Sequence, residues 1–167
     1  MSWLSKIFKS QNQKKRSISF DEKDFWIIDL KESDISLFIK NLEMFFLKEA
    51  IIYIEGGSIN FKIQEYLDSV QVDVSKIANI QRGTIWPKPK IFHIPLESSV
   101  LQKLSEFTDD YDLIELCEHL VIYKDKKILM AGYDIFDEKI YLSGQIEENL
   151  IRDFCDKIGG DYYRGPN

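Results

Sequence analysis

Four ionisable side chains in the second half of the chain are of types that acid–base chemistry or metal binding uses. His93 and His119 are the only histidines, and Glu118 and Asp134 are carboxylates that border the same apolar segments. A carboxylate beside an imidazole can orient the ring or complete a metal site. Their spacing matches no metal motif, and packed or surface histidines explain it equally well. We keep His93, His119 and Asp134 as candidates for a catalytic or ligand-binding pocket, and predict neither a metal nor a cofactor.

The turn at Gly56, Gly57 and Ser58 is a second candidate, because it lies between an apolar run and a helical pattern. Backbone N–H groups in such a turn can bind an anion. The pattern lacks the lysine of a phosphate loop, and a tight turn with Ser58 as helix N-cap explains it too. No serine or cysteine has the setting of an activated nucleophile, so the sequence leans away from an enzyme. Cys117 and Cys155 are expected to be reduced and packed.

Negative charge is concentrated between Glu106 and Glu118. No lysine or arginine occurs between Lys103 and Lys124. Acids this close in sequence create a field that can steer a basic partner, and a nearby aromatic residue can supply an anchor. The alternative is a solvated acidic helix end, which charge runs commonly are. The predicted binding residues are Asp109, Asp110, Tyr111, Asp112, Glu115 and Glu118.

Residues 82–90 form a proline-rich strip that contains Trp86. Each proline fixes its own backbone and biases the preceding residue away from helix, so we expect the strip to be extended. Trp86 could line a groove for a partner, or it could pack into the core and pin a long connection. We include it among the candidate binding residues.

The charge of the chain is unevenly divided. The net charge is −6, yet residues 1–16 carry five cations and no acid. The acidic remainder argues against nucleic acid as a partner. We expect residues 1–19 to be a basic arm and linker, without a signal peptide, and residues 20–167 to be one globular domain. One side of a short helix in the arm could contact an anionic membrane weakly, a disordered tail being the alternative. That side carries Trp3, Leu4, Ile7 and Phe8.

Apolar periodicity predicts one α/β to α+β sandwich with a mixed sheet of five to six strands. Strands at 25–30 and 50–54 with an amphipathic helix at 34–47 between them predict a βαβ-like first half. In the second half, strand patterns predict an antiparallel meander closed by a C-terminal helix. Those strands are expected at 120–123, 128–136 and 140–142, and the helix is expected to begin at Ser143 or Gly144 and to end at Gly159.

These patterns favour a non-catalytic cytoplasmic protein-binding domain that uses its acidic surface against a basic protein partner. A small acidic inhibitor, such as an immunity protein that neutralises a toxin, has this character, although no sequence resemblance supports it. One alternative is an enzyme or small-ligand-binding protein with a pocket near His93, His119 and Asp134. Another is a peripheral membrane module tethered by residues 1–16. The sequence does not specify the oligomeric state.

Overall fold

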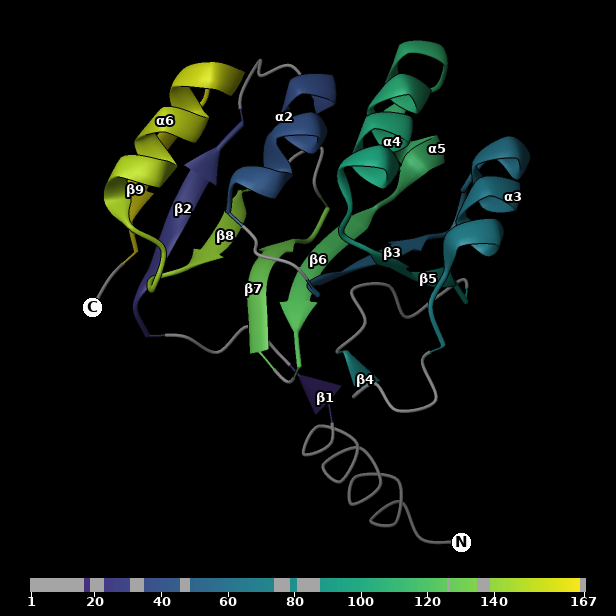
Figure 1. Cartoon of the computed structure of the whole chain (residues 1–167), viewed down its shortest axis with the longest axis horizontal. Helices are drawn as coiled ribbons and strands as arrows, with labels where there is room; N and C mark the ends of the chain where they lie inside the picture. Colours follow the sequence, from purple (N-terminus) through teal and green to yellow (C-terminus); the bar gives the residue numbers. More distant parts are fainter. Residues whose placement is uncertain are drawn as a thin grey trace, which may run out of the picture.

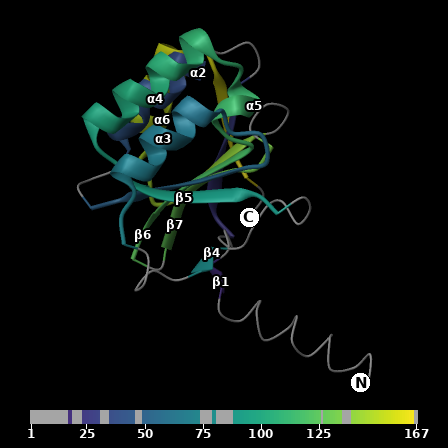
Figure 2. The same ribbon diagram turned by 90° about the vertical axis from the view of Figure 1, so that its right-hand side faces the viewer.

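The computed structural model shows an α+β fold in which helices cover one face of an antiparallel sheet (Figures 1 and 2). No helix in the ranges described is long and apolar enough to cross a membrane. The structure describes residues 17–18, 23–30, 35–45, 49–73, 79–80, 88–125, 127–134 and 139–165.

The main sheet has seven strands in the order β5-β3-β6-β7-β8-β2-β9, and every neighbouring pair is antiparallel. A separate parallel ribbon of β1 and β4 lies away from the helices (Figure 1). The strands are β1 (Ser17–Ile18), β2 (Phe25–Asp29), β3 (Ile51–Gly56), β4 (Asn79–Ile80), β5 (Lys90–Pro95), β6 (His119–Lys124), β7 (Lys127–Gly132), β8 (Ile140–Ser143) and β9 (Asp161–Arg164).

The pairing differs from the predicted mixed sheet of five to six strands. β2 and β3 run in the same direction and are joined through a helix, as the βαβ-like pattern indicated, but β6, β7 and β8 lie between them. A strand–helix–strand pattern indicates that the chain crosses the sheet, and it does not specify which strands become neighbours. The predicted meander is confirmed in β6, β7 and β8, with a tight turn at Asp125, whose φ is 55°.

The helices are placed much as their apolar periodicity predicts, and their apolar sides face the sheet. The predicted helix at 34–47 is shorter, because α2 passes into a 3₁₀ turn at Leu42–Met44, and residues 46–48 lie outside the described ranges. The short helix α5 was not predicted. The helices are α2 (Ile35–Asn41), α3 (Phe61–Val70), α4 (Ser98–Asp110), α5 (Leu113–Leu116) and α6 (Glu148–Ile158).

Two helix starts correct the sequence analysis. The N-cap of α3 is Asn60 and not Ser58, because Asn60 Oδ1 accepts the Lys62 N–H (3.0 Å). The C-terminal helix starts at Glu148 and not at Ser143 or Gly144. A Cβ at position 144 would lie 2.3 Å from the Asp24 carbonyl oxygen, so this glycine permits a close backbone approach. The predicted end at Gly159 is confirmed, with φ of 73°.

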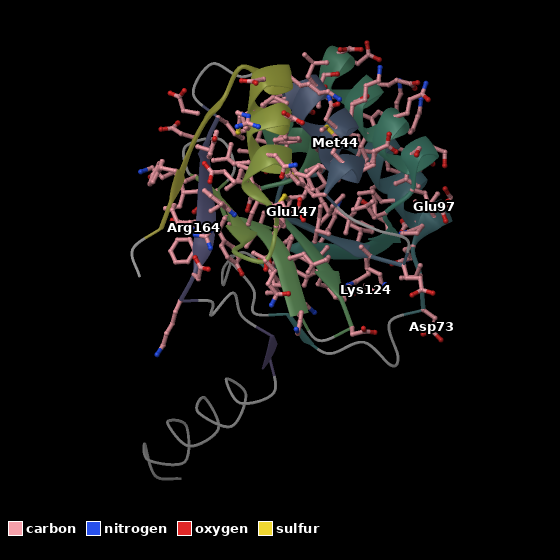
Figure 3. All side chains as sticks on the ribbon, turned by 60° about the vertical axis from the view of Figure 1, so that its left-hand side comes forward. Met44, Asp73, Glu97, Lys124, Glu147 and Arg164 are labelled. Atoms are coloured by element: carbon pink, nitrogen blue, oxygen red, sulfur yellow. The ribbon has the colours of Figure 1, made fainter. Side chains whose placement is uncertain are left out.

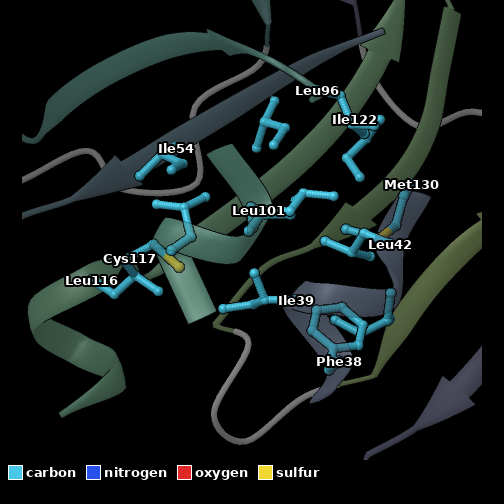
Figure 4. Packing of buried hydrophobic residues seen from close by; sticks show 14 of the residues in the cluster. Phe38, Ile39, Leu42, Ile54, Leu96, Leu101, Leu116, Cys117, Ile122 and Met130 are labelled. Carbon is cyan, nitrogen blue, oxygen red and sulfur yellow. The ribbon is translucent and has the colours of Figure 1, made fainter. Parts of the chain in front are cut away.

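The core fills the space between the helices and the sheet (Figure 4). Ile54 of β3, Ile122 of β6 and Met130 of β7 point into it from the sheet. From the helix side come Phe38, Ile39, Leu42, Leu101, Leu116 and Cys117. Strand β3 is buried on both faces, as its continuous apolar run predicts. On the face away from the helices, Tyr53 packs in a smaller apolar cluster with residues of β6 and β7.

Strand β9 was not predicted. It pairs with β2 at the edge of the sheet, and Arg164 adds side-chain contacts to that pairing (Figure 3). Its Nε donates to Asp24 Oδ1 (2.7 Å), and its guanidinium carbon lies 4.3 Å from the centre of the Trp26 ring. The next residue follows with a hydrogen bond from the Gly165 N–H to the Phe25 carbonyl oxygen (2.8 Å). A polar four-residue strand carries little hydrophobic alternation, which explains why sequence patterns missed it.

Candidate functional site

The sheet face opposite the helices carries a cluster of aromatic and ionisable side chains. Glu55 is fully buried there, with 0% exposure, and Tyr53 Oη donates to its Oε2 (2.5 Å). Burial and the nearby Glu55 carboxyl raise the pKa of Tyr133. We call this set the second-face cluster: Tyr53, Glu55, His93, His119, Tyr123 and Tyr133.

Both histidines belong to the second-face cluster, but each has its own partners. His93 Nδ1 lies 2.8 Å from Tyr123 Oη, and burial lowers the pKa of His93. His119 Nδ1 accepts the Asp134 N–H (2.8 Å), which places the proton of a neutral ring on Nε2. The Asp134 Oδ1 atom is 3.7 Å from the same His119 nitrogen.

The predicted set of ionisable groups is therefore only partly assembled. His119 and Asp134 meet, whereas His93 lies two strands from His119, which ladder spacing puts at roughly 12 Å between Cα atoms. Glu118 instead accepts the Gly57 N–H. The predicted strand at 128–136 ends early, because β7 stops at Gly132. Among the described residues, no three His, Cys, Asp or Glu side chains are arranged to hold a metal ion.

At the turn of Gly56, Gly57 and Ser58, one backbone N–H is already bound by an acid of the same chain, Glu118. The Gly57 N–H donates to Glu118 Oε1 (3.1 Å), so a carboxylate already holds the donor that an anion would need. A Cβ at Gly56 would lie 2.9 Å from Ile59 Cγ1, which gives this glycine a packing role. These contacts support the structural interpretation of the turn over anion binding.

Three acids of the predicted acidic surface have partners within the fold. Glu106 forms an ion pair with Lys103 (2.9 Å). Glu115 Oε1 accepts from Asn60 Nδ2 (3.0 Å), and Glu118 holds the Gly57 N–H. Glu115 and Glu118 connect α5 and the residues after it to the loop before α3, whereas Glu106 belongs to an exposed ion pair within α4.

The other three predicted acids form the exposed part of this surface, where α4 ends and α5 begins. Asp109 and Asp110 are in the last turn of α4, and Asp112 precedes α5. Within the described part of the chain, the ion pairs include none of the three. Asp109 and Asp110 lie at the negative end of the α4 dipole, and the last turn of α4 has no basic residue to offset them, whereas Asp112 is at the N-terminus of α5.

The predicted anchor Tyr111 is half-buried and packs against Phe107, with ring centres 6.2 Å apart. Two other apolar side chains, at the start of α3 and in α5, are well exposed instead. They are Phe61, 68% exposed, and Ile114, 47% exposed. Sequence reasoning missed both. Phe61 falls opposite the apolar stripe of α3 at 100° per residue, and that offset was the available signal.

The remaining candidates divide into two groups. Cys117 and Cys155 are free and buried, as predicted, and burial raises the pKa of each thiol to about 12. Trp86, the side chains Trp3, Leu4, Ile7 and Phe8, and the rest of the predicted basic arm through residue 16 lie outside the described residues.

No protein-family model matches the chain, and no curated protein or solved structure is significantly similar to it.

Proposed function

We propose that this chain is a cytoplasmic, non-catalytic protein-binding domain that holds a basic protein partner where α4 ends and α5 begins. The observation that carries the proposal is the position of Asp109, Asp110 and Asp112, exposed and outside the ion pairs of the described chain. A small acidic inhibitor of a basic protein would use a surface of this kind. Free, buried thiols accord with a reducing compartment.

The acids at the end of α4 are electrostatically unfavourable in the isolated chain. Negative charge near a helix C-terminus opposes the helix dipole, at about 0.3–1 kcal/mol per charge at an exposed site. Lysine or arginine would be the stabilising choice at these positions. A cation supplied by a partner would remove this cost on binding. Binding therefore gives a reason for acids that are unfavourable in the free fold.

A basic partner would also gain in association rate. Exposed charges of one sign steer an oppositely charged protein before contact, and at 0.1 M salt this attraction is largely screened beyond about 10 Å. The proposal therefore includes a strong salt dependence. The antiparallel sheet and the helices packed on it provide a rigid support for the surface.

The test is affinity capture from a native lysate with the tagged full chain, with mass spectrometry of the bound proteins. Asp109→Lys/Asp110→Lys is compared with a matched control on α6, Asp153→Lys/Asp156→Lys, which reverses two other exposed acids. Asp112 stays intact because it is the N-cap of α5. Lysine suits the C-terminus of α4, so loss of capture is not expected to reflect unfolding.

A basic protein captured by the wild-type chain and the control at low salt, but not by the α4 variant, is the expected result. Capture should fall at high salt. Equal capture by all three chains, or capture that does not change with salt, would overturn the proposal.

A further inference from the structure

We infer that the partner contributes a basic segment with an apolar side chain that docks on Phe61 and Ile114. This inference rests on the proposed function and specifies the chemistry of the partner at the same surface. Four large apolar side chains are well exposed among the described residues, and two of them are here. The four are Leu37, Phe61, Ile114 and Tyr163.

Hydrogen bonds place the two apolar residues close together. The Asn60 N–H donates to the Glu115 carbonyl oxygen (2.8 Å), and Asn60 Nδ2 donates to Glu115 Oε1. Phe61 follows Asn60 and Ile114 precedes Glu115, so backbone dimensions keep their Cα atoms within roughly 15 Å. A single short peptide segment can reach both.

Neither apolar residue has an evident stabilising role in its own helix. Phe61 is the first residue of α3, where the positive end of the dipole favours an acid, and the first turn of α3 has none. Ile114 lies in the first turn of α5 with its side chain about half exposed. Exposed aromatic and aliphatic side chains that stand together are typical anchors of protein interfaces.

The charges around these anchors select the partner. Asp112 lies two residues before Ile114, and Asp109 and Asp110 precede Asp112 in the last turn of α4. On α3, the exposed Glu65 and Asp68 outnumber the exposed Lys62. An apolar centre with an acidic surround is complementary to a basic segment that carries an apolar side chain.

The test measures the affinity of the full chain for two labelled synthetic peptides by fluorescence anisotropy. One peptide consists of lysine and serine with two central leucines, and its matched form has serine in place of the leucines. Phe61→Ser and Ile114→Ser are compared with Leu37→Ser, which removes an exposed apolar side chain from α2. Both peptides are also tested on Asp109→Asn/Asp110→Asn.

We expect the leucine peptide to bind the wild-type chain about tenfold more tightly than the serine peptide, the gain from burying apolar surface. Phe61→Ser or Ile114→Ser should remove most of that preference, and Leu37→Ser should keep it. If the two peptides bind equally and binding depends on Asp109 and Asp110, the inference fails while the proposed function stands. If neither peptide binds, or binding ignores the aspartates, both fail.

Discussion

Asn60 and Glu115 are joined by two hydrogen bonds, one through the Asn60 backbone N–H and one through its side-chain amide. The same side chain caps α3, because Asn60 Oδ1 accepts the Lys62 N–H. One asparagine therefore starts α3 and fastens it to α5. This contact sets the relative positions of the two helix starts that carry Phe61 and Ile114.

Asn60→Ala should destabilise the protein by about 1–2 kcal/mol, toward the upper part of the range for a lost N-cap, since the bond to Glu115 is lost too. The measurement is the free energy of unfolding in urea. Asn60→Ser keeps a capping oxygen but loses the amide donor, so its free energy of unfolding should lie between those of the wild-type chain and Asn60→Ala. An unchanged unfolding midpoint in Asn60→Ala would show that this contact does not stabilise the fold.

Asp109→Asn should stabilise the free protein, by about 0.3–1 kcal/mol at low salt, because it removes a negative charge from the C-terminal end of α4. Asp110→Asn should gain slightly less. Glu106, through its hydrogen bond and its charge, is the main cause of the raised pKa of Lys103, and the Asp110 charge adds a smaller favourable contribution. Urea unfolding at low and high salt checks both. A loss of stability in Asp109→Asn would contradict the proposed cost of these acids.

His93 should make stability depend on pH below its usual pKa. Burial lowers the pKa of the folded imidazole below 6.5, so the unfolded chain takes up a proton more readily. Stability should therefore be complete above about pH 7.5 and fall as the pH drops below about 6.5, toward the folded pKa. Thermal unfolding across this range gives the dependence.

The matched variant for this prediction is His93→Gln, which cannot titrate. It should be less stable than the wild-type chain near neutral pH, because the contact with Tyr123 Oη changes. The difference between the two chains should shrink as the pH falls, since only the wild-type chain loses stability by protonation at this position. Parallel pH profiles would assign the dependence to other groups.

Local sequence patterns were reliable where apolar periodicity was strong. The strand at Phe25–Asp29, the doubly buried β3 and the amphipathic α6 all follow from alternation or helical spacing. The order of the strands could not be predicted in this way. The antiparallel placement of β6, β7 and β8 between β2 and β3 depends on long-range packing, which single-segment patterns do not encode.

In the candidate site, too, local features could be predicted and long-range contacts could not. The exposure of Asp109, Asp110 and Asp112 agrees with the acidic stretch in the sequence, but the internal roles of Glu115 and Glu118 depend on a loop more than fifty residues away. No charge pattern predicts that contact. Placing the cap of α3 at Asn60 in advance would have drawn attention to Phe61 as an exposed first residue.

Cys117 and Cys155 should resist modification in the folded protein. Both are buried, and burial raises the pKa of each thiol to about 12, so the reactive thiolate is scarce near pH 8. A thiol reagent such as Ellman's reagent should titrate neither cysteine quickly in the native chain and both in concentrated guanidinium chloride. Rapid native reaction of Cys117 would instead reveal local opening where α5 meets β6.

Tyr53→Phe should destabilise the fold, because it removes a hydrogen-bond donor from a fully buried carboxyl group. Losing one partner of a buried polar group costs about 1–3 kcal/mol, whereas the ring itself still fills its place. Tyr66→Phe is a suitable control, since that ring packs against Phe107 on the helix side and its loss of a hydroxyl should stay within about 0.5 kcal/mol. Unfolding in urea distinguishes the two. If Tyr53→Phe behaves like the control, Glu55 is held by its other contacts, and the second-face cluster does not depend on this bond.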